Sequence, residues 1–261
     1  MTPVKDPTLR HERALGRQGA RLIIGVDEVG RGALAGPVAV GMCVIDPVRP
    51  GKFPAGLRDS KLLAEARREQ LAPLASAWAR ASAVGLASAA EVDELGIIFC
   101  LGLAGARALS TLLAAGVDVE GAVLVLDGNH DYLSRHLVSV VPNPLTVTTK
   151  IKADRDCASV AAASVVAKVH RDRLMIALDA EVPGYSWASN KGYGSSAHFE
   201  ALELLGPSDH HRRTWLKSER ALFELGADGE VEVDAQGELE ADEAALGVDV
   251  AELEVDEAAR A

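Results

Sequence analysis

Four carboxylates stand at or just beyond the ends of apolar runs that resemble buried strands. Asp27 and Glu28 close the first run, and Asp127 closes a later one. Asp154 follows a third, directly before a long helical segment. Carboxylates brought together near a core repel one another and raise each other's pKa values, and burying them unpaired is costly. A divalent cation removes that penalty, and oxygen ligands without Cys or His favour Mg²⁺ or Mn²⁺.

Two of these acids, Asp127 and Asp154, and the nearby Asp156 also have a structural interpretation. Asp154 or Asp156 can be the N-cap of the helix that follows, because Asp side chains accept hydrogen bonds from first-turn N–H groups. Asp127-Gly128 can be an ordinary turn dipeptide. Taken one at a time, the residues leave both interpretations open.

Two glycines flank Arg31 directly after the first pair of acids. A regular strand sends adjacent side chains to opposite faces, so Asp27 and Glu28 share one site only if the chain bends there. Gly30 and Gly32 would permit such a bend. The tripeptide is either a hairpin connection or a loop whose N–H groups approach a phosphate or sugar, with Arg31 adding charge.

A second glycine-rich segment surrounds Tyr193. It is either a plain surface loop or a site where the ring lies against a nucleotide sugar or base. Ser164 and Lys168 are four residues apart and share one face of a predicted helix. Lys168 is either a snorkelling residue at the edge of that helix or a phosphate contact.

The remaining basic and thiol groups are predicted to have ordinary roles. His170, Arg171 and Arg173 are predicted to be solvated helix surface. The stretch 210–213 lacks metal-ligand spacing, so phosphate attraction or a structural hydrogen bond is the expected role. Cys157 lacks the partners of a thiol nucleophile and is predicted to pack in the core.

The elements that must position these residues alternate between strands and helices. Residues 1–20 are predicted to be an irregular leader and 183–198 a Gly/Ser/Tyr-rich loop. Periodicity predicts strands at 21–27, 38–45, 80–88, 122–126 and 145–150, and helices at 62–79, 89–116 with a break near Gly96, 157–178, 198–206 and 215–225. The pattern predicts an α/β or α+β domain with a mixed five-stranded sheet.

The net charge of −11 argues at first against a protein that binds phosphate backbones. Residues 224–261, however, hold 14 acidic residues and one arginine, a net charge of −13. The other 223 residues hold 26 Lys and Arg against 24 Asp and Glu, a net charge of +2. We predict one domain at 21–223 and, at 224–261, an acidic tail too poor in apolar residues to fold alone.

Cysteine content and hydropathy indicate the compartment. Three scattered cysteines are too few for a disulfide framework, which favours a reducing cytoplasm. No uncharged apolar run reaches the length of a membrane span, so none is expected.

Several motifs, in order, resemble the ribonuclease HII family, the type 2 ribonucleases H of bacteria. The resemblance covers about residues 22–222 and begins with the long signature at 27–38. It continues through Asp59-Ser60-Lys61, Leu126-Asp127-Gly128-Asn129, Lys152-Ala153-Asp154, the helical run 161–169, Arg171-Asp172, Lys191-Gly192-Tyr193-Gly194 and His211-Arg212-Arg213. The sequence departs from the pattern at Val29, at Ala153, where the family usually has Gly, and at Trp215.

This resemblance implies a ribonuclease-H-like fold with a small C-terminal helical extension. It implies an endonuclease that cuts the RNA strand of RNA–DNA hybrids and cuts at single ribonucleotides in duplex DNA, leaving 5′-phosphate and 3′-hydroxyl ends. Asp27, Glu28, Asp127 and Asp154 are the implied ligands of two divalent cations, Mg²⁺ or Mn²⁺. The implied enzyme is a monomer of the cytoplasm that takes part in ribonucleotide excision repair.

The resemblance also implies the substrate contacts. Glycine-rich backbone and Arg31 would meet the ribonucleotide and its 2′-hydroxyl, with Tyr193 stacking on the adjoining sugar. Hydroxyl and lysine side chains would hold the phosphates. The full set is Gly30, Arg31, Gly32, Ser60, Lys61, Ser164, Lys168 and Tyr193.

Overall fold

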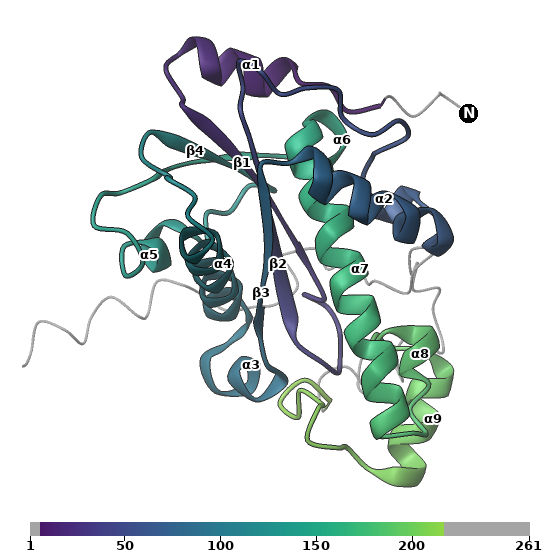
Figure 1. Cartoon of the computed structure of the whole chain (residues 1–261). Helices are drawn as coiled ribbons and strands as arrows, with labels where there is room; N and C mark the ends of the chain where they lie inside the picture. Colours follow the sequence, from purple (N-terminus) through teal and green to yellow (C-terminus); the bar gives the residue numbers. More distant parts are fainter. Residues whose placement is uncertain (1–5, 217–261) are drawn as a thin grey trace, which may run out of the picture.

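A computed structural model describes residues 6–216 of the chain, and Figure 1 shows their arrangement. Strands and helices are mixed along the sequence, as predicted. They are α1 (Arg10–Arg17), β1 (Leu22–Val29), β2 (Val38–Ile45), the 3₁₀ turn η1 (Ser60–Leu62), α2 (Glu65–Trp78), β3 (Ala81–Ala87), α3 (Ala89–Leu95), α4 (Ile97–Ala114), β4 (Ala122–Asp127), α5 (Ser134–Leu137), β5 (Thr146–Lys150), α6 (Ala153–Asp156), α7 (Ala158–Glu181), α8 (Trp187–Asn190) and α9 (Ser196–Leu205).

The five strands form one mixed sheet in the order β3-β2-β1-β4-β5. β1 pairs antiparallel with β2, as the predicted hairpin requires, and parallel with β4. The parallel pairing sets Val26 opposite Leu126 and brings the carboxyl ends of β1 and β4 to the same edge. The predicted α/β fold with a mixed five-stranded sheet is therefore confirmed.

Helices cover both faces of the sheet (Figure 1). α4 packs against β3 and β2 on one face, while α7 packs against β1 and β2 on the other and carries α2 on its outer side. Glycines permit both close approaches. A Cβ at Gly85 would lie 1.9 Å from the Ala104 carbonyl oxygen, and a Cβ at Gly25 would lie 2.2 Å from the Ser159 carbonyl carbon.

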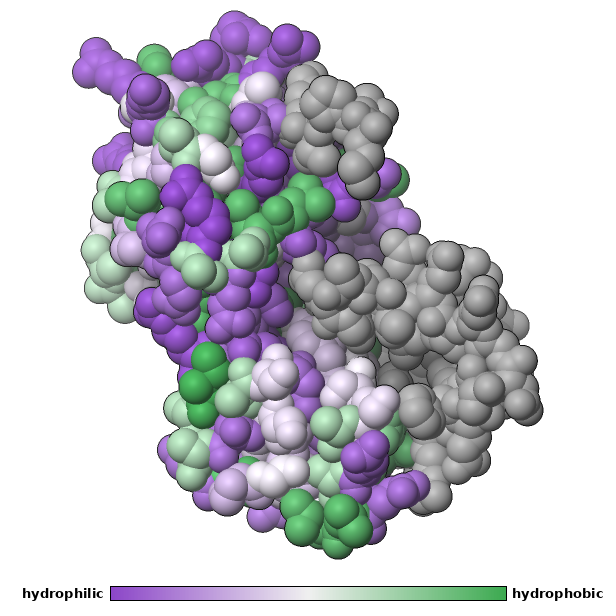
Figure 2. All heavy atoms as spheres, turned by 90° about the vertical axis from the view of Figure 1, so that its right-hand side faces the viewer, coloured by the Kyte–Doolittle hydropathy of each residue, from purple (hydrophilic) through white to green (hydrophobic). Residues whose placement is uncertain are grey.

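α4 is the one helix within residues 6–216 that is long and apolar enough to cross a membrane by length and composition. Half of its residues are buried, and its contacts with β3 and β2 form part of the hydrophobic core. Figure 2 shows the face on the right-hand side of Figure 1, where apolar residues form separate patches within a mostly hydrophilic surface.

The structure corrects two predicted segments and leaves a third mostly outside the described residues. Residues 10–17 of the predicted irregular leader form α1, because its buried Glu12 is bonded to α7. The predicted loop 183–198 contains the short helix α8, with Trp187 fully buried. Most of the helix predicted at 215–225, and all of the acidic tail, lie outside the described residues.

Candidate active site

Asp27 and Glu28 lie within β1, and the predicted bend between them is wrong. The pairing with β2 stays regular through Val29, so the two side chains leave the strand on opposite faces. Ser164 of α7 is near enough to Asp27 to lower its pKa, while Glu28 accepts a hydrogen bond from the Tyr132 hydroxyl at 3.2 Å. Both side chains nevertheless lie near Asp127, because β1 extends beyond the end of β4. The negative charge of Asp127 raises the pKa of each.

Asp127 is the last residue of β4 and is held by the turn before α6. Its Oδ1 accepts hydrogen bonds from the backbone nitrogen atoms of Ala153 (2.5 Å) and Asp154 (3.4 Å). The left-handed residue in this turn is Lys152, with φ of 59°. Because Ala153 itself is helical, its departure from the family's usual glycine leaves the turn intact.

Asp154 lies in the first turn of α6 and is 9% exposed. Neither it nor Asp156 is an N-cap: α6 follows Lys152, α7 follows Cys157, and no side chain of those N-cap residues caps either helix. Asp156 instead pairs with Lys150 at 2.5 Å. The N-cap interpretation of both acids is therefore wrong.

Asp59 is a fifth acid that the strand-end argument missed. It is 1% exposed, accepts the backbone N–H of Lys61 at 2.9 Å, and lies 3.3 Å from Nε of Arg155. Its negative charge raises the pKa of Asp154 and of Asp127. The only signal for it in the sequence is its place in the Asp59-Ser60-Lys61 motif, since it follows a loop rather than a strand.

Burial and mutual repulsion shape the electrostatics of the site. Burial is the largest cause of a raised pKa at Asp27, Glu28, Asp127 and Asp154, and neighbouring acids raise each further. For Asp154 the pKa reaches about 7. A set of oxygen donors that repel one another in this way fits divalent cations. Among residues 6–216, no three acidic, His or Cys side chains already stand close enough together to surround one ion.

The loop at Gly30 is held from its inner side. Arg212 donates to the carbonyl oxygen atoms of Arg31 at 2.8 Å and Gly30 at 2.6 Å. Gly30 has φ of +81°, and a Cβ there would lie 2.1 Å from Nε of Arg171. A Cβ at Gly32 would meet nothing within 4 Å, so that side of the loop is open.

Arg171 and Arg212 are both fully buried. Arg171 donates to the carbonyl oxygen atoms of Pro37, Lys191 and Ala35, so its predicted place on solvated helix surface is wrong. The structural hydrogen bonds predicted for residues 210–213 are confirmed at Arg212. Cys157 is buried in the core, as predicted.

Tyr193 links the glycine loop to α7. Its hydroxyl accepts the Gly30 N–H at 3.1 Å, and its ring is 3% exposed. Nζ of Lys168 lies 5.4 Å from the ring centroid and 3.1 Å from Oδ1 of Asp172. Lys168 is 6% exposed, so the snorkelling interpretation is wrong.

The remaining predicted contacts surround the acids. The Ser164 hydroxyl donates to the Ser60 hydroxyl at 2.8 Å and accepts the Ser60 N–H at 3.3 Å, which joins η1 to α7. Arg31 and Lys61 are exposed, and their positive charges lower the pKa of Glu28. The structure thus gathers all predicted site residues around one edge of the sheet.

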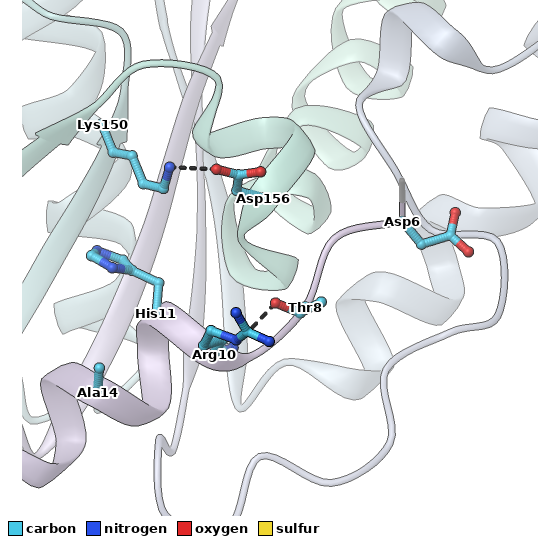
Figure 3. Close-up of a pocket in the computed structure, with 7 residues that line it drawn as sticks. All are labelled: Asp6, Thr8, Arg10, His11, Ala14, Lys150 and Asp156. Atoms are coloured by element: carbon cyan, nitrogen blue, oxygen red, sulfur yellow. Dashed lines mark hydrogen bonds and ion pairs between the residues drawn. The ribbon is translucent and has the colours of Figure 1, made fainter. Parts of the chain in front are cut away.

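A separate cleft of about 370 Å³ lies between the N-terminal segment, β5 and α6 (Figure 3). It contains none of the predicted site residues. Its lining residues come from the N-terminal segment, β5 and α6: Asp6, Thr8, Arg10, His11, Ala14, Lys150 and Asp156.

Comparisons with known proteins agree with this geometry. The sequence model of the family described as ribonuclease HII matches residues 24–218. A ribonuclease HII of Streptomyces griseus is 46% identical over 217 residues, covering 82% of this chain and 85% of that protein. One of Thermus thermophilus is 47% identical over 192 residues, covering 74% and 85%.

A solved structure shares the fold. The ribonuclease H2 of Pyrococcus horikoshii superposes with a TM-score of 0.59 at 26% sequence identity. The alignment covers 76% of this chain and 96% of that one.

Proposed function

Because this chain belongs to the ribonuclease HII family, whose members are endoribonucleases acting on the RNA of RNA–DNA hybrids, we propose that it also cleaves duplex DNA at a single embedded ribonucleotide. The observation that carries the proposal is the set of buried and half-buried carboxylates that repel one another beside the Gly30–Gly32 loop. Hydrolysis leaves a 5′-phosphate and a 3′-hydroxyl.

We infer that Asp27, Glu28, Asp127 and Asp154 hold two divalent cations, Mg²⁺ or Mn²⁺. Bound ions supply a nucleophilic water and positive charge at the scissile phosphate. The repulsion among the four acids supports this role, because ion binding relieves it. Asp59 and the backbone around Ala153 orient Asp154 and Asp127 for that task.

Selectivity for RNA rests on the glycine loop. The 2′-hydroxyl is the group that distinguishes ribose from deoxyribose, so backbone groups must approach it closely. The open side of Gly32 leaves room for that approach, and Arg31 adds charge. Tyr193 fixes the loop through Gly30, and its proposed role is to stack on the adjoining sugar.

Phosphates are held beside the acids. Ser60, Lys61 and Ser164 supply hydroxyl, N–H and charged groups from η1 and α7. Lys168 contributes positive charge beneath Tyr193 while it is paired with Asp172. We further propose that the catalytic domain spans 21–223 and acts as a monomer in ribonucleotide excision repair. The proposed compartment is the reducing cytoplasm, which the three free, buried cysteines support.

One assay tests the function. Three duplexes are offered with Mg²⁺ or Mn²⁺ and again with EDTA: DNA with one ribonucleotide, an RNA–DNA hybrid, and plain DNA. We expect metal-dependent cleavage of the first two only. Cleavage of plain DNA, or cleavage that survives EDTA, would contradict the proposal.

A further inference from the structure

α7 begins without a cap of its own. The first N–H groups of a helix need acceptors from outside it, and Cys157 at the N-cap position supplies none from its side chain. The acceptor comes from α1, 147 residues earlier in the chain. Oε1 of Glu12 accepts both the backbone N–H and the hydroxyl of Ser159, each at 2.9 Å. Glu12 is fully buried.

Thr8 joins the chain on the other side of the same junction. Its N–H donates to the Asp156 carbonyl oxygen at 2.9 Å, and its own carbonyl oxygen accepts the Ala158 N–H at 3.1 Å. Figure 3 shows Thr8 and the start of α1 beside Asp156. The segment 8–12 therefore binds the junction between α6 and α7 through hydrogen bonds at both of its ends, Thr8 and Glu12.

This junction carries part of the proposed metal site. α6 holds Asp154, and the N–H groups of Ala153 and Asp154 fix Asp127. The Cys157 N–H bonds back to the Ala153 carbonyl oxygen at 2.7 Å, so a shift at the start of α7 moves the turn that holds both acids.

The start of α7 also packs closely against the sheet. Ser159 lies against Gly25 of β1, two residues before Asp27. A displacement of α7 at Ser159 would therefore shift three of the four proposed ligands, Asp27, Asp127 and Asp154.

We propose that Glu12 is a positioning residue, which caps α7 in place of the missing N-cap and so holds Asp154 and Asp127 at the spacing that metal binding needs. The inference rests on the proposed function of the four acids. It assigns a role to a segment that precedes residue 24, where the family match begins.

The chemistry of Glu12 suggests matched variants. Its second oxygen, Oε2, is buried with no hydrogen-bond partner, so the acceptor at Oε1 is what the junction uses. Glu12→Gln keeps an acceptor of the same reach, whereas Glu12→Ala removes it and leaves two buried donors of Ser159 unpaired.

A control variant separates positioning from plain stability. Glu91 completes the capping box of α3, accepting the Ser88 N–H at 2.8 Å, and pairs with Arg107 at 2.7 Å. Glu91→Ala removes a cap and an ion pair away from the four acids. It should lower the midpoint of thermal unfolding without altering metal binding.

The test is calorimetric titration of Mn²⁺ into each full-length protein without substrate, together with the Mn²⁺ concentration that half-saturates cleavage. For Glu12→Ala we expect the Kd for Mn²⁺ and the half-saturating Mn²⁺ concentration each to rise about fivefold. This is less than the tenfold or more seen when a group touching a metal ligand is removed. Cleavage at saturating Mn²⁺ should largely recover, KM for the duplex should not change, and Glu12→Gln should behave as the wild type.

Two results would overturn the inference. One is a Glu12→Ala protein whose Mn²⁺ affinity matches that of Glu91→Ala while only its thermal midpoint falls. The other applies if Glu12→Ala does not fold: Ser159→Ala, which removes one of the two bonds, then shows no loss of Mn²⁺ affinity. A wild-type protein that neither binds Mn²⁺ nor cleaves would instead refute the proposed function.

Discussion

At the scale of single residues, Asp127 has the most completely defined surroundings of the four acids. Asp127→Asn keeps the oxygen that accepts the Ala153 N–H but removes the negative charge. We expect the cleavage rate to fall at least about 100-fold while duplex binding persists, because only the proposed ligand is lost. Single-turnover cleavage and fluorescence anisotropy measure the two quantities. Near-normal cleavage would show that Asp127 is not a ligand.

Tyr193 tests the glycine loop. Tyr193→Phe retains the ring but leaves the buried Gly30 N–H without its acceptor, which costs about 1–3 kcal/mol. We expect kcat/KM on the single-ribonucleotide duplex to fall about tenfold, the equivalent of about 1.4 kcal/mol, with little change in duplex affinity.

Tyr185→Phe is the matched control for this experiment. The Tyr185 hydroxyl donates to the Gly206 carbonyl oxygen at 2.7 Å, a partner outside the glycine loop. Equal losses in the two variants would contradict a role for Tyr193 in placing the loop.

At the scale of elements, the glycine loop depends on a residue near the end of the described chain. Arg212→Leu leaves the carbonyl oxygen atoms of Arg31, Gly30 and Gly36 without their donor. We expect the free energy of unfolding to fall by roughly 3 kcal/mol and cleavage to fall with it, because buried acceptors are left unpaired. Urea unfolding measures the first effect.

Arg213→Leu is the control. The Arg213 side chain is 59% exposed and pairs with Asp209 on the surface, so its loss should change stability by less than about 1 kcal/mol. Comparable destabilisation by the two variants would mean that Arg212 does not hold the loop.

The elements after α7 predict a pH dependence of stability. His198 Nδ1 lies 2.9 Å from the Tyr193 carbonyl oxygen, its Nε2 lies 3.0 Å from Nε2 of His211, and His211 Nδ1 accepts the Ser208 N–H. This series of hydrogen bonds requires the imidazole rings of both His198 and His211 to be neutral. Burial, with the charge of His198 as a second cause, lowers the pKa of His211 to about 4.

The sign follows from the lowered pKa. Between pH 6.5 and about pH 4, His211 is protonated in the unfolded state but neutral in the folded state. The stability that neutral His211 contributes to the folded state is therefore fully present above pH 6.5 and is lost as the pH falls. The raised pKa values of the acids act in the opposite direction. The measurement is therefore the difference in urea stability between wild type and His211→Gln, which should narrow by about 2 kcal/mol between pH 7 and pH 4.5.

His170→Gln on the exposed side of α7 should leave the pH dependence of the wild type unchanged. A difference between wild type and His211→Gln that does not vary with pH would contradict the neutral pair.

At the scale of the whole molecule, charge is divided between two parts of the chain. Residues 224–261 carry −13, and the rest carries +2. With four acids neutralised by bound ions, the remainder that meets the duplex would be basic, and its affinity should fall as salt rises. The segment 224–261 is either a solubilising tail or a mimic of nucleic-acid charge that inhibits the enzyme.

Truncation after Phe223 distinguishes the two. If the segment only aids solubility, duplex affinity at low salt should stay within about twofold of that of the full chain. Anisotropy at two salt concentrations measures it. A clear gain in affinity on truncation that disappears at high salt would favour self-inhibition.

The sequence by itself determined the strands, the hairpin and the break at Gly96, because these depend on local periodicity. The cost of placing charge beside a core also singled out the four acids, whose role as metal ligands stays a prediction. It could not place Asp59, Arg171 or Arg212, since their partners lie on distant elements and their neighbours in sequence look solvated. It missed α1 for the same reason: that helix has few apolar residues, and Glu12 is buried through its bonds to α7. Only the tertiary structure decided how Asp27 and Glu28, on opposite faces of a regular strand, meet at one site. They do so because β1 extends beyond the end of β4. The register between these two strands is set by pairing of residues a hundred positions apart in the sequence.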